Sequence, residues 1–431
     1  MAGPVQAVLV GAGNRGYRAY GRYALEFPHN LRFVAVVEPD PGRRERFARD
    51  HAIPAERQFA DWQDLLQGPR LAEAAVNATM DPMHVASTTG LLEAGYEVLL
   101  EKPIAQTPED CLVLAAAAER RGRLLQIGHV LRYAPFFRAV YDVLRAGRVG
   151  PVISVDWREN LVYWHYAHSF VRGNWRRADT SGPMLLTKCC HDLDLLVWMF
   201  GGMCERIASF GGQRRFTSAT VGPEVPGRCL DGCPYADTCE YYAPRLYLDR
   251  LEENPDNFTV GAITLDHTYT GVMRALEDGP YGRCVYRSDN DVVDHQVVLM
   301  RFADNQAVTL TMQGASHVEG RTLRIDGLHG TLLGNEARGE LVLIDHLTGT
   351  RTAIETPIRH LGAHGGGDVG LLDAFVAAVR GERQEVSTSA RESIDSHLMA
   401  FAGEEARISG ETIDMHAYRA RIEARLGAGV G

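Results

Sequence analysis

The sequence has neither an apolar run long enough to cross a membrane nor a cluster of basic residues of the kind that binds nucleic acid. A membrane-spanning helix needs about 20 consecutive apolar residues. The apolar run at 5–10 has no charged segment before it and no cleavage site after it, so it is not a secretion signal. The formal net charge of −10 opposes binding to phosphate backbones. These absences predict a cytoplasmic protein with no membrane or nucleic-acid partner.

Internal repeats, low-complexity tracts and long charged linkers are also absent. Domain boundaries therefore have to be inferred from hydrophobic patterns. With 431 residues, of which 45% are hydrophobic, the chain can bury a large core and is long enough for two domains.

Residues 1–130 are predicted to form an α/β Rossmann domain with a doubly wound parallel sheet. Short apolar runs alternate here with helical patterns, and continuous Val, Ile and Leu runs are typical of parallel strands buried on both faces. Each intervening helix supplies the crossover between two parallel strands. The predicted strands are 5–10, 33–37, 74–78, 98–100 and 124–127.

Residues 131–431 are predicted to form an α+β domain with an open, predominantly antiparallel sheet. Near Gly150 the pattern changes to the alternation that is typical of half-exposed strands. Further alternating stretches lie at 296–302, 307–312, 323–325 and 341–345. The predicted helices are 135–145, 184–200, which interrupts the sheet, and 370–380 and 390–409, which pack back on the body.

Three glycines follow the first predicted strand in the pattern of a dinucleotide-binding turn. Gly11 permits the tight turn, Gly13 lets backbone N–H groups approach a pyrophosphate, and Gly16 allows the following helix to pack closely. Glu38 ends the second predicted strand, where its carboxylate can accept hydrogen bonds from both hydroxyls of the adenosine ribose. The combination predicts an NAD site, and the alternative is a tight turn without a ligand.

Glu38 also bears on the choice between NAD and NADP. Its carboxylate repels a 2′-phosphate and favours NAD, whereas Arg43 and Arg44 could pair with that phosphate. We therefore expect NAD, with NADP less favoured.

Five further segments resemble the Gfo/Idh/MocA family of oxidoreductases, which includes glucose-fructose oxidoreductase and inositol dehydrogenases. The segments are 77–84, 95–103 with its Glu-Lys-Pro motif, 128–133, 175–176 and 191–194. A Lys-Cys-Cys-His-Asp-Leu-Asp helix and a cysteine-rich loop mark a subgroup. The resemblance covers nearly the whole chain, and it implies an open second sheet whose exposed face supports a homodimer or homotetramer.

The resemblance also implies which residues contact the cofactor. In that family the lysine of the Glu-Lys-Pro motif, here Lys102, lies beside the nicotinamide ring and the substrate, and a Trp-Arg pair touches the nicotinamide end. The implied cofactor contacts are Gly11, Gly13, Asn14, Arg15, Gly16, Glu38, Thr79, His84, Glu101, Lys102, Trp175 and Arg176.

Lys102, His191 and Lys188 are the predicted catalytic residues. The family's helix has an aspartate four residues before its acid/base histidine, but Thr187 takes that place here and Lys188 follows it. We expect His191 to accept a hydroxyl proton as hydride leaves carbon for nicotinamide, while Lys102 and Lys188 position the oxygen. Lys188 and His191 are three residues apart, so in a continuous helix they share a face.

The segment 164–176 is predicted to be a substrate loop, because aromatic faces stack on sugars while His and Arg side chains bond hydroxyl groups or a carboxylate. An ordinary loop with packed aromatic side chains is the alternative. The candidate substrate contacts are Arg132, Tyr133, His165, His168, Arg172, Lys188, His191 and Asp194, with Asn174, Trp175 and His364 as further candidates.

Three cysteines gather in the loop 226–245. Cys229, Cys233 and Cys239 could hold a structural Zn²⁺, which would order a loop that buries little apolar surface of its own. Reduced, metal-free thiols are the equal alternative, and an iron–sulfur cluster is less favoured. The candidates for a fourth ligand are Cys204, Cys189, Cys190 and a histidine.

We therefore expect an NAD-dependent oxidoreductase that transfers hydride between nicotinamide and a hydroxyl carbon of a sugar, polyol or glycoside. The alternative is a redox-neutral, NAD-dependent glycoside hydrolase that oxidises C3 transiently, eliminates the substituent, adds water and reduces the product again. That reaction needs a second base. A non-catalytic NAD-sensing protein is disfavoured because Lys102 and His191 are both present.

Overall fold

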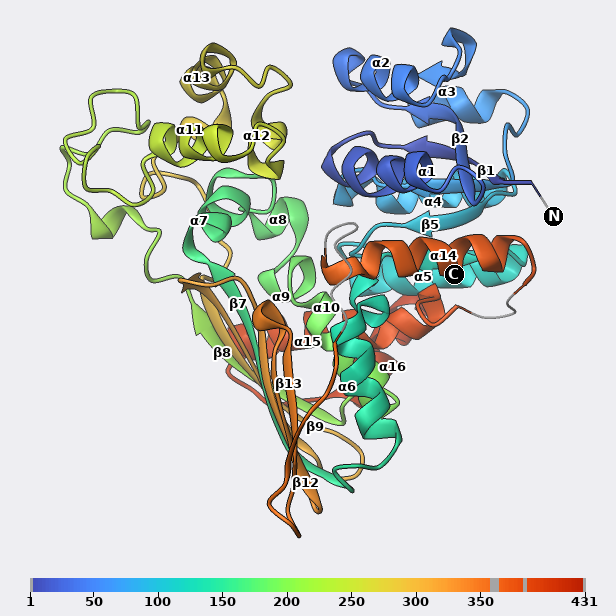
Figure 1. Ribbon diagram of the computed structural model, residues 1–431, viewed down its shortest axis with the longest axis vertical. Helices are drawn as coiled ribbons and strands as arrows, with labels where there is room; N and C mark the ends of the chain where they lie inside the picture. Colours follow the sequence, from blue (N-terminus) through green and yellow to red (C-terminus); the bar gives the residue numbers. More distant parts are fainter. Residues whose placement is uncertain (1–2, 357–363, 383–385, 429–431) are drawn as a thin grey trace.

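Two β-sheets organise the chain, and helices pack on their faces (Figure 1). The structure, a computed structural model, describes residues 3–356, 364–382 and 386–428. The first sheet is blue to cyan in Figure 1, and the second sheet lies below it to the left. Within the described residues, no helix has both the length and the apolar character needed to cross a membrane.

The first sheet confirms the predicted doubly wound fold. Its six strands are all parallel and lie in the order β3-β2-β1-β4-β5-β6, the order of a dinucleotide-binding sheet. The strands are β1 (Val5–Val10), β2 (Leu31–Val37), β3 (Gln58–Phe59), β4 (Ala74–Asn77), β5 (Glu97–Leu100) and β6 (Leu125–Ile127). The main helices between them are η1 (Arg15–Gly21), α1 (Arg22–Glu26), α2 (Pro41–Asp50), α3 (Trp62–Gln67), α4 (His84–Glu93) and α5 (Pro108–Arg121).

Local signals set the ends of these helices. The Asp40 carboxylate accepts a hydrogen bond from the Arg43 backbone N–H (2.8 Å) and caps α2. The Thr107 hydroxyl accepts one from the Asp110 N–H (3.1 Å) and caps α5. Helix α5 ends at Gly122, whose φ of +59° is the left-handed conformation that favours glycine.

The second sheet has nine strands in the order β14-β13-β12-β11-β7-β10-β9-β8-β15, and only the β7–β10 pair is parallel. This confirms the predominantly antiparallel sheet. Its outer face exposes Phe210 and Leu299, and the homodimer or homotetramer expected on that face stays a prediction. The strands are β7 (Val152–Val162), β8 (Arg206–Gly212), β9 (His295–Arg301), β10 (Ala307–Ser316), β11 (Gly320–Gly327), β12 (Gly330–Asn335), β13 (Glu340–Asp345), β14 (Arg351–Ala353) and β15 (Ile413–Asp414).

The helix expected over 184–200 is broken in two, which corrects the prediction. Helix α9 (Met184–Thr187) ends at Lys188, where φ is −113° and ψ is −55°, and α10 (Cys190–Phe200) begins after Cys189. Lys188 and His191 therefore do not share the face of one continuous helix. The break leaves the last carbonyls of α9 without partners in the helix.

The segment between β8 and β9 corrects the expectation that a single helix interrupts the second sheet. It carries α11 (Ala243–Glu253), α12 (Phe258–Ile263) and α13 (Tyr269–Asp278), which pack around a small apolar core of their own. Helices as short as α12 and α13 span too few turns to show a clear period in the sequence. The insertion reaches the first sheet's helices, because Asn14 donates a hydrogen bond to the Phe258 carbonyl (3.1 Å).

The last helices contact both sheets. Helix α14 (Gly367–Val379) contacts η1 and the turn η4 (Val130–Tyr133), while α15 (Ala390–Ser409) packs against α5 and β8. In Figure 1, α14 lies beside α5. Helix α16 (Met415–Ala428) follows and also contacts α5. The predicted helices over 370–380 and 390–409 are confirmed, whereas the domain division at residue 130 stays a prediction.

Arg132 and Asp194 form a buried ion pair between η4 and α10. Both side chains are almost fully buried, and the guanidinium donates two hydrogen bonds of 2.7 Å to the two carboxylate oxygens. Arg132 also donates to the Ser387 carbonyl (2.5 Å). The charged atoms of each residue are therefore used by the other, and the expectation that Arg132 and Asp194 bind substrate stays a prediction.

We predict that Asp194→Asn lowers the free energy of unfolding by about 3 kcal/mol, because it leaves the Arg132 guanidinium buried without a counter-charge. Urea denaturation measures the change. Asp326→Asn is the control, since it breaks a partly exposed pair with Arg324 and should change stability little. Equal stability of the wild type and Asp194→Asn would contradict this interpretation.

Candidate functional site

The glycine turn after β1 has the close contacts that the sequence predicted. Gly11 has a φ of +95°, and a Cβ placed on it would lie 2.5 Å from the Ala78 carbonyl oxygen. A Cβ on Gly16 would lie 1.9 Å from the Gly11 oxygen, so the turn and η1 pack without room for a side chain. A Cβ on Gly13 would meet nothing within 4 Å, which leaves open space where a pyrophosphate would approach.

Glu38 lies directly after β2 and turns its carboxylate toward this turn. One carboxylate oxygen accepts a hydrogen bond from the Ala12 N–H (2.8 Å), and the other accepts one from the Asp40 N–H (3.1 Å). Arg44, which could have paired with a 2′-phosphate, donates to the backbone carbonyls of Glu38 (2.5 Å) and Pro39 (3.3 Å). The Glu38 carboxylate therefore faces the glycine turn, while the Arg44 guanidinium is bonded to backbone carbonyls.

Arg15, in the glycine turn, is held by two carboxylates. Its guanidinium pairs with Glu101 (2.6 Å) and with Asp368 of α14 (2.8 Å), and Tyr20 donates its hydroxyl to Glu101 (2.5 Å). Burial alone would raise the pKa of Glu101, but the Arg15 charge and the Tyr20 hydroxyl lower it below its ordinary value. The carboxylate therefore stays ionised beside Lys102.

Lys102 reaches from the end of β5 to the broken helix of the second sheet. Its ammonium donates a hydrogen bond to the Thr187 carbonyl (2.7 Å), one of the orphan carbonyls of α9. A favourable place for a cation is the C-terminal end of a helix. The peptide bond between Lys102 and Pro103 is cis. Thr187 takes the place of the family's aspartate, so the oxygen that Lys102 contacts here is a backbone carbonyl oxygen.

Asp81, which the sequence reasoning missed, adds a carboxylate next to Lys102. It follows β4 in the turn η3 (Asp81–Met83) and accepts a hydrogen bond from the Trp175 indole N–H (3.0 Å). Burial raises the pKa of Asp81, while the nearby charges of His84 and Lys102 act in the opposite direction. Its place directly after a parallel strand was the available signal, because ligands bind at that edge.

His191 lies near Lys102 in a row of imidazole rings. The ring is 5% exposed and lies 5.6 Å from the His129 ring and 5.9 Å from the His364 ring. Burial and the Lys102 charge lower the pKa of His191 well below its ordinary value. The imidazole is therefore neutral near pH 7 and can accept a proton.

Lys188 points to a different cluster of charges. Its ammonium pairs with Glu159 (3.3 Å) and Glu319 (3.6 Å), and Arg321 also pairs with Glu159 (2.5 Å). Burial would lower the pKa of Lys188, but the two carboxylates raise it above its ordinary value, so the side chain stays cationic. Lys188 is therefore a fixed charge at this cluster.

His165 is the member of the predicted substrate loop that faces this cluster. Its Nδ1 lies 2.9 Å from a Glu319 oxygen, and its side chain is 22% exposed. Burial would raise the pKa of Glu319, but the His165 hydrogen bond and the Lys188 charge lower it to about 2. An ionised carboxylate, an ammonium and an imidazole thus stand together at the edge of the loop.

Two other members of the loop are buried away from this cluster, and their expected contact with substrate stays a prediction. His168 hydrogen-bonds the Tyr247 hydroxyl (2.9 Å) and stacks on Tyr281, with ring centroids 4.8 Å apart. Arg172 is fully buried and donates to the carbonyls of Arg283 and Tyr241 (2.7 Å each). Sequence composition could not show which aromatic and basic side chains turn inward.

The remaining predicted contacts are tied to neighbouring backbone and side chains. His84 lies between the Pro103 carbonyl (2.7 Å) and the Thr79 carbonyl (3.2 Å), and it links the two loops that follow β4 and β5. Arg176 pairs with Asp289 (2.7 Å). Tyr133 contributes its hydroxyl to bonds with Gln126, Ser387 and Thr388.

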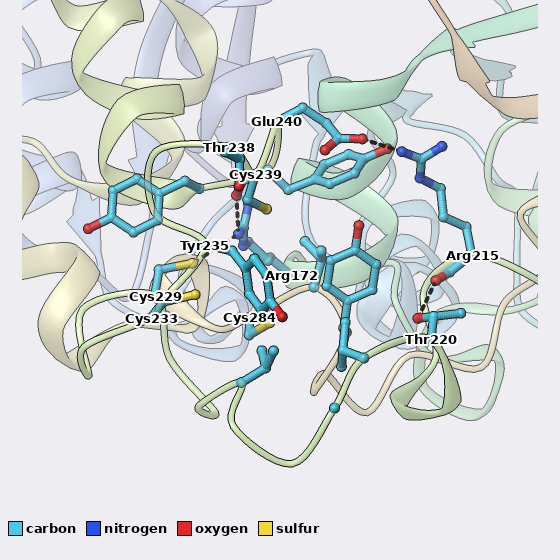
Figure 2. A pocket seen from close by; sticks show the side chains of 17 residues that line it. Arg172, Arg215, Thr220, Cys229, Cys233, Tyr235, Thr238, Cys239, Glu240 and Cys284 are labelled. Carbon is cyan, nitrogen blue, oxygen red and sulfur yellow. Dashed lines mark hydrogen bonds and ion pairs between the residues drawn. The ribbon is translucent and has the colours of Figure 1, made fainter.

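The cysteine loop lies away from these residues, and Cys284 joins it instead of Cys204. Cys229, Cys233, Cys239 and Cys284 all line one cavity (Figure 2). Cys204 precedes β8, close to Asp395 of α15, and does not line that cavity. Across residues 3–356, 364–382 and 386–428, no group of three or more His, Cys, Asp or Glu side chains could hold a metal ion, so the expected structural Zn²⁺ is not supported.

Comparisons with known proteins match both parts of the chain. The family described as "Oxidoreductase family, NAD-binding Rossmann fold" matches residues 5–129, and its "C-terminal alpha/beta domain" matches residues 142–415. The YteT protein of Bacillus subtilis is 24% identical over 85% of this chain and 87% of its own length. Inositol 2-dehydrogenase of Acidothermus cellulolyticus is 28% identical over 51% of this chain and 60% of its own length.

Solved structures share the fold over almost the whole chain. A levoglucosan dehydrogenase in complex with NADH and levoglucosan has a TM-score of 0.70 at 16% identity, covering 96% of this chain and 99% of that one. An oxidoreductase from Agrobacterium radiobacter in complex with NAD⁺, L-tartaric acid and magnesium has a TM-score of 0.68 at 14% identity, with the same coverage. With its glycine turn, its Glu-Lys-Pro motif and both domains matched, this chain belongs to the Gfo/Idh/MocA family of oxidoreductases.

Proposed function

We propose that the protein is an NAD-dependent dehydrogenase that takes hydride from a hydroxyl-bearing carbon of a sugar, polyol or glycoside. The observation that carries this proposal is the position of the Lys102 ammonium. It donates a hydrogen bond to the Thr187 carbonyl and lies near His191. The meeting point lies at the carboxyl edge of a parallel sheet, where such sheets bind ligands. The glycine turn opens at the same edge, so cofactor and substrate would meet there.

Bound NAD would accept the hydride at its nicotinamide ring, and the other tasks fall to residues of the chain. His191 accepts the hydroxyl proton, because burial and the Lys102 charge keep its imidazole neutral. Lys102 donates a hydrogen bond to the same oxygen and stabilises the negative charge that develops there. The Thr187 carbonyl holds the ammonium in place.

The proposed substrate class is polyhydroxylated. His165, Lys188 and Glu319 combine hydrogen-bond donors and acceptors at one edge of the predicted substrate loop, which suits several hydroxyl groups at once. Relatives named inositol 2-dehydrogenase and a fold neighbour named levoglucosan dehydrogenase support the same class.

Redox-neutral glycoside cleavage is the second candidate function, and one observation favours it. The reaction needs a second base, and the His364 ring lies 5.9 Å from the His191 ring. Asp368 lies 3.4 Å from His364 Nδ1 and can hold that imidazole in one orientation. The two imidazoles could then remove protons from neighbouring positions of one ring.

The test is incubation of the purified protein with NAD⁺ and a panel of sugars, polyols and aryl glycosides, with NADH absorbance and product analysis followed together. NADH that accumulates in step with an oxidised product supports the dehydrogenase. Glycoside cleavage that requires NAD⁺ but yields no net NADH supports the second candidate. The absence of both products across the panel would reject the proposed function.

We predict that Lys102→Ala and His191→Asn each lower kcat by about 100- to 10,000-fold, the range for loss of a positioned acid or base. In the wild type, kcat/KM should fall on the acid side only below about pH 6.5, the ordinary histidine value, because the pKa of His191 is lowered. That acid limb should vanish in His191→Asn. His295→Asn is the control, since His295 is half-exposed at the start of β9.

A separate prediction concerns cofactor choice. Glu38→Gln should weaken NAD⁺ binding about tenfold, because each hydrogen bond to a charged group contributes about 1.5 kcal/mol or more. The same substitution should reduce the preference for NAD⁺ over NADP⁺. Dissociation constants for both dinucleotides measure the effect. Asp40→Asn, which changes a nearby carboxylate that caps α2, should leave the preference intact. An unchanged preference in Glu38→Gln would count against the assignment.

The glycine turn offers a matched pair of variants. Gly13→Ala should keep the wild-type melting temperature but lose NAD⁺ affinity, because the added methyl group fits the chain yet occupies the approach to the pyrophosphate. Gly16→Ala should lower both the melting temperature and the NAD⁺ affinity, because its methyl group collides with the Gly11 carbonyl. Thermal unfolding and calorimetric titration separate the two outcomes. Full NAD⁺ affinity in Gly13→Ala would contradict the placement of the cofactor.

A further inference from the structure

A cavity of about 500 Å³ lies beside the cysteine loop (Figure 2). Lys102, Lys188 and His191 do not line it, so it is separate from the proposed active site. Cavities of this size hold small organic molecules. Tyr235 and Glu240 line it and are exposed, so a small molecule can enter it from solvent.

Arg172 is a buried cation at the wall of this cavity, and no carboxylate among the described residues pairs with it. Figure 2 shows its side chain among the cysteines. The guanidinium donates to the carbonyls of Arg283 and Tyr241 (2.7 Å each) and to the Cys229 sulfur (3.5 Å). Its terminal nitrogen Nη1 has no hydrogen-bond partner in the described part of the chain. Because a buried charge is strongly unfavourable unless it is paired, this position favours an anion.

The cysteines beside Arg172 do not supply that anion. Burial raises the pKa of the Cys239 and Cys284 thiols, so both are neutral near pH 7. Cys229 donates its thiol hydrogen toward the Arg283 carbonyl (3.9 Å), and only the protonated thiol can do so. The wall of the cavity therefore carries a positive charge that these thiols leave uncompensated.

The rest of the wall is mainly aromatic and aliphatic, with one buried hydroxyl group. Tyr241 is fully buried, and across the described residues its hydroxyl has no hydrogen-bond partner. Its ring lies 6.2 Å from the Tyr286 ring, at an angle of 86°. Arg215, at the rim, already pairs with Glu240. The aliphatic lining residues are Val221, Val225 and Val285. A ligand here would meet a cation and a hydroxyl with its polar end, and apolar groups with its body.

We propose that this cavity binds an aromatic monocarboxylate, whose carboxylate pairs with Arg172 and accepts a hydrogen bond from the Tyr241 hydroxyl. One negative charge matches the one unpaired guanidinium. A planar aromatic body packs against the Tyr286 ring and covers the apolar wall, which inorganic phosphate would leave uncovered. Binding is non-covalent, so the thiols take no chemical part in it.

The bound carboxylate would join two segments that are distant in the sequence. Arg172 ends η5 (Ala167–Arg172) in the predicted substrate loop, and Tyr241 lies just before α11 of the insertion. A ligand that binds only the folded chain stabilises it. We therefore expect the melting temperature to rise with the ligand concentration.

The experiment uses the full-length wild-type protein under reducing conditions, with benzoate, trans-cinnamate and 3-phenylpropanoate as probes. Calorimetric titration should find one site per chain for at least one of them. The corresponding amide should bind at least about tenfold more weakly, because it lacks the charge that pairs with the guanidinium. Absence of binding by all three carboxylates, or equal binding of acid and amide, would overturn the proposal. Neither result depends on NAD binding or on enzymatic activity.

Variants then locate the site. Tyr241→Phe should weaken binding about 3- to 10-fold, the usual effect of losing one neutral hydrogen bond, and should keep the melting temperature of the free protein. Tyr235→Phe is the matched control and should keep the affinity, because its exposed hydroxyl already donates to Glu224 (2.9 Å).

Arg172→Gln should weaken binding more than about tenfold, and Arg172→Lys should restore part of the affinity. If Arg172→Gln does not fold, the comparison of Tyr241→Phe with Tyr235→Phe decides the question. Unchanged affinity in Tyr241→Phe, or an equal loss in Tyr235→Phe, would show that the probe binds elsewhere and would refute the site.

Discussion

The hydrogen bond from the Lys102 ammonium to the Thr187 carbonyl (2.7 Å) joins the two sheets at the candidate active site. It exists because the helix expected over 184–200 breaks at Lys188 and leaves a carbonyl free at the end of α9. The same break turns Lys188 toward Glu159 and Glu319 and starts α10 with His191 near Lys102. The break at Lys188 thereby gives Lys102, Lys188 and His191 different neighbours.

Buried charges around this junction are compensated in separate clusters, and that separation gives His191 its character. Unpaired buried charges are strongly unfavourable, and several cations here are matched by carboxylates, whereas Lys102 hydrogen-bonds the Thr187 carbonyl. His191 is buried close to the Lys102 ammonium, and burial together with that charge lowers the pKa of its imidazole well below the ordinary value. The matched clusters are Arg15 with Glu101 and Asp368, Arg132 with Asp194, and Lys188 and Arg321 with Glu159.

Much of the fold could be predicted from the sequence, because continuous apolar runs and strong helix ends are local signals. The helices over 135–145 and 390–409 match α6 (Pro135–Arg145) and α15. The break at Lys188 could not be predicted, since the contacts of Lys102 and Glu159 that accompany it come from distant segments. For the same reason, the inward turn of Arg172 and the arrival of Cys284 beside the cysteine loop depend on tertiary packing that spacing does not encode.

The central claim is that Lys102 lies where the nicotinamide and the substrate meet. Lys102 and Lys188 are the only lysines in the sequence, so reductive methylation with ¹³C-formaldehyde labels two side chains besides the N-terminal amine. The account predicts that NAD⁺ together with a substrate from the panel shifts the NMR signal of Lys102 and leaves that of Lys188 nearly unchanged, with Lys188→Arg assigning the two signals. Saturating NAD⁺ binding without any change in the Lys102 signal would contradict it.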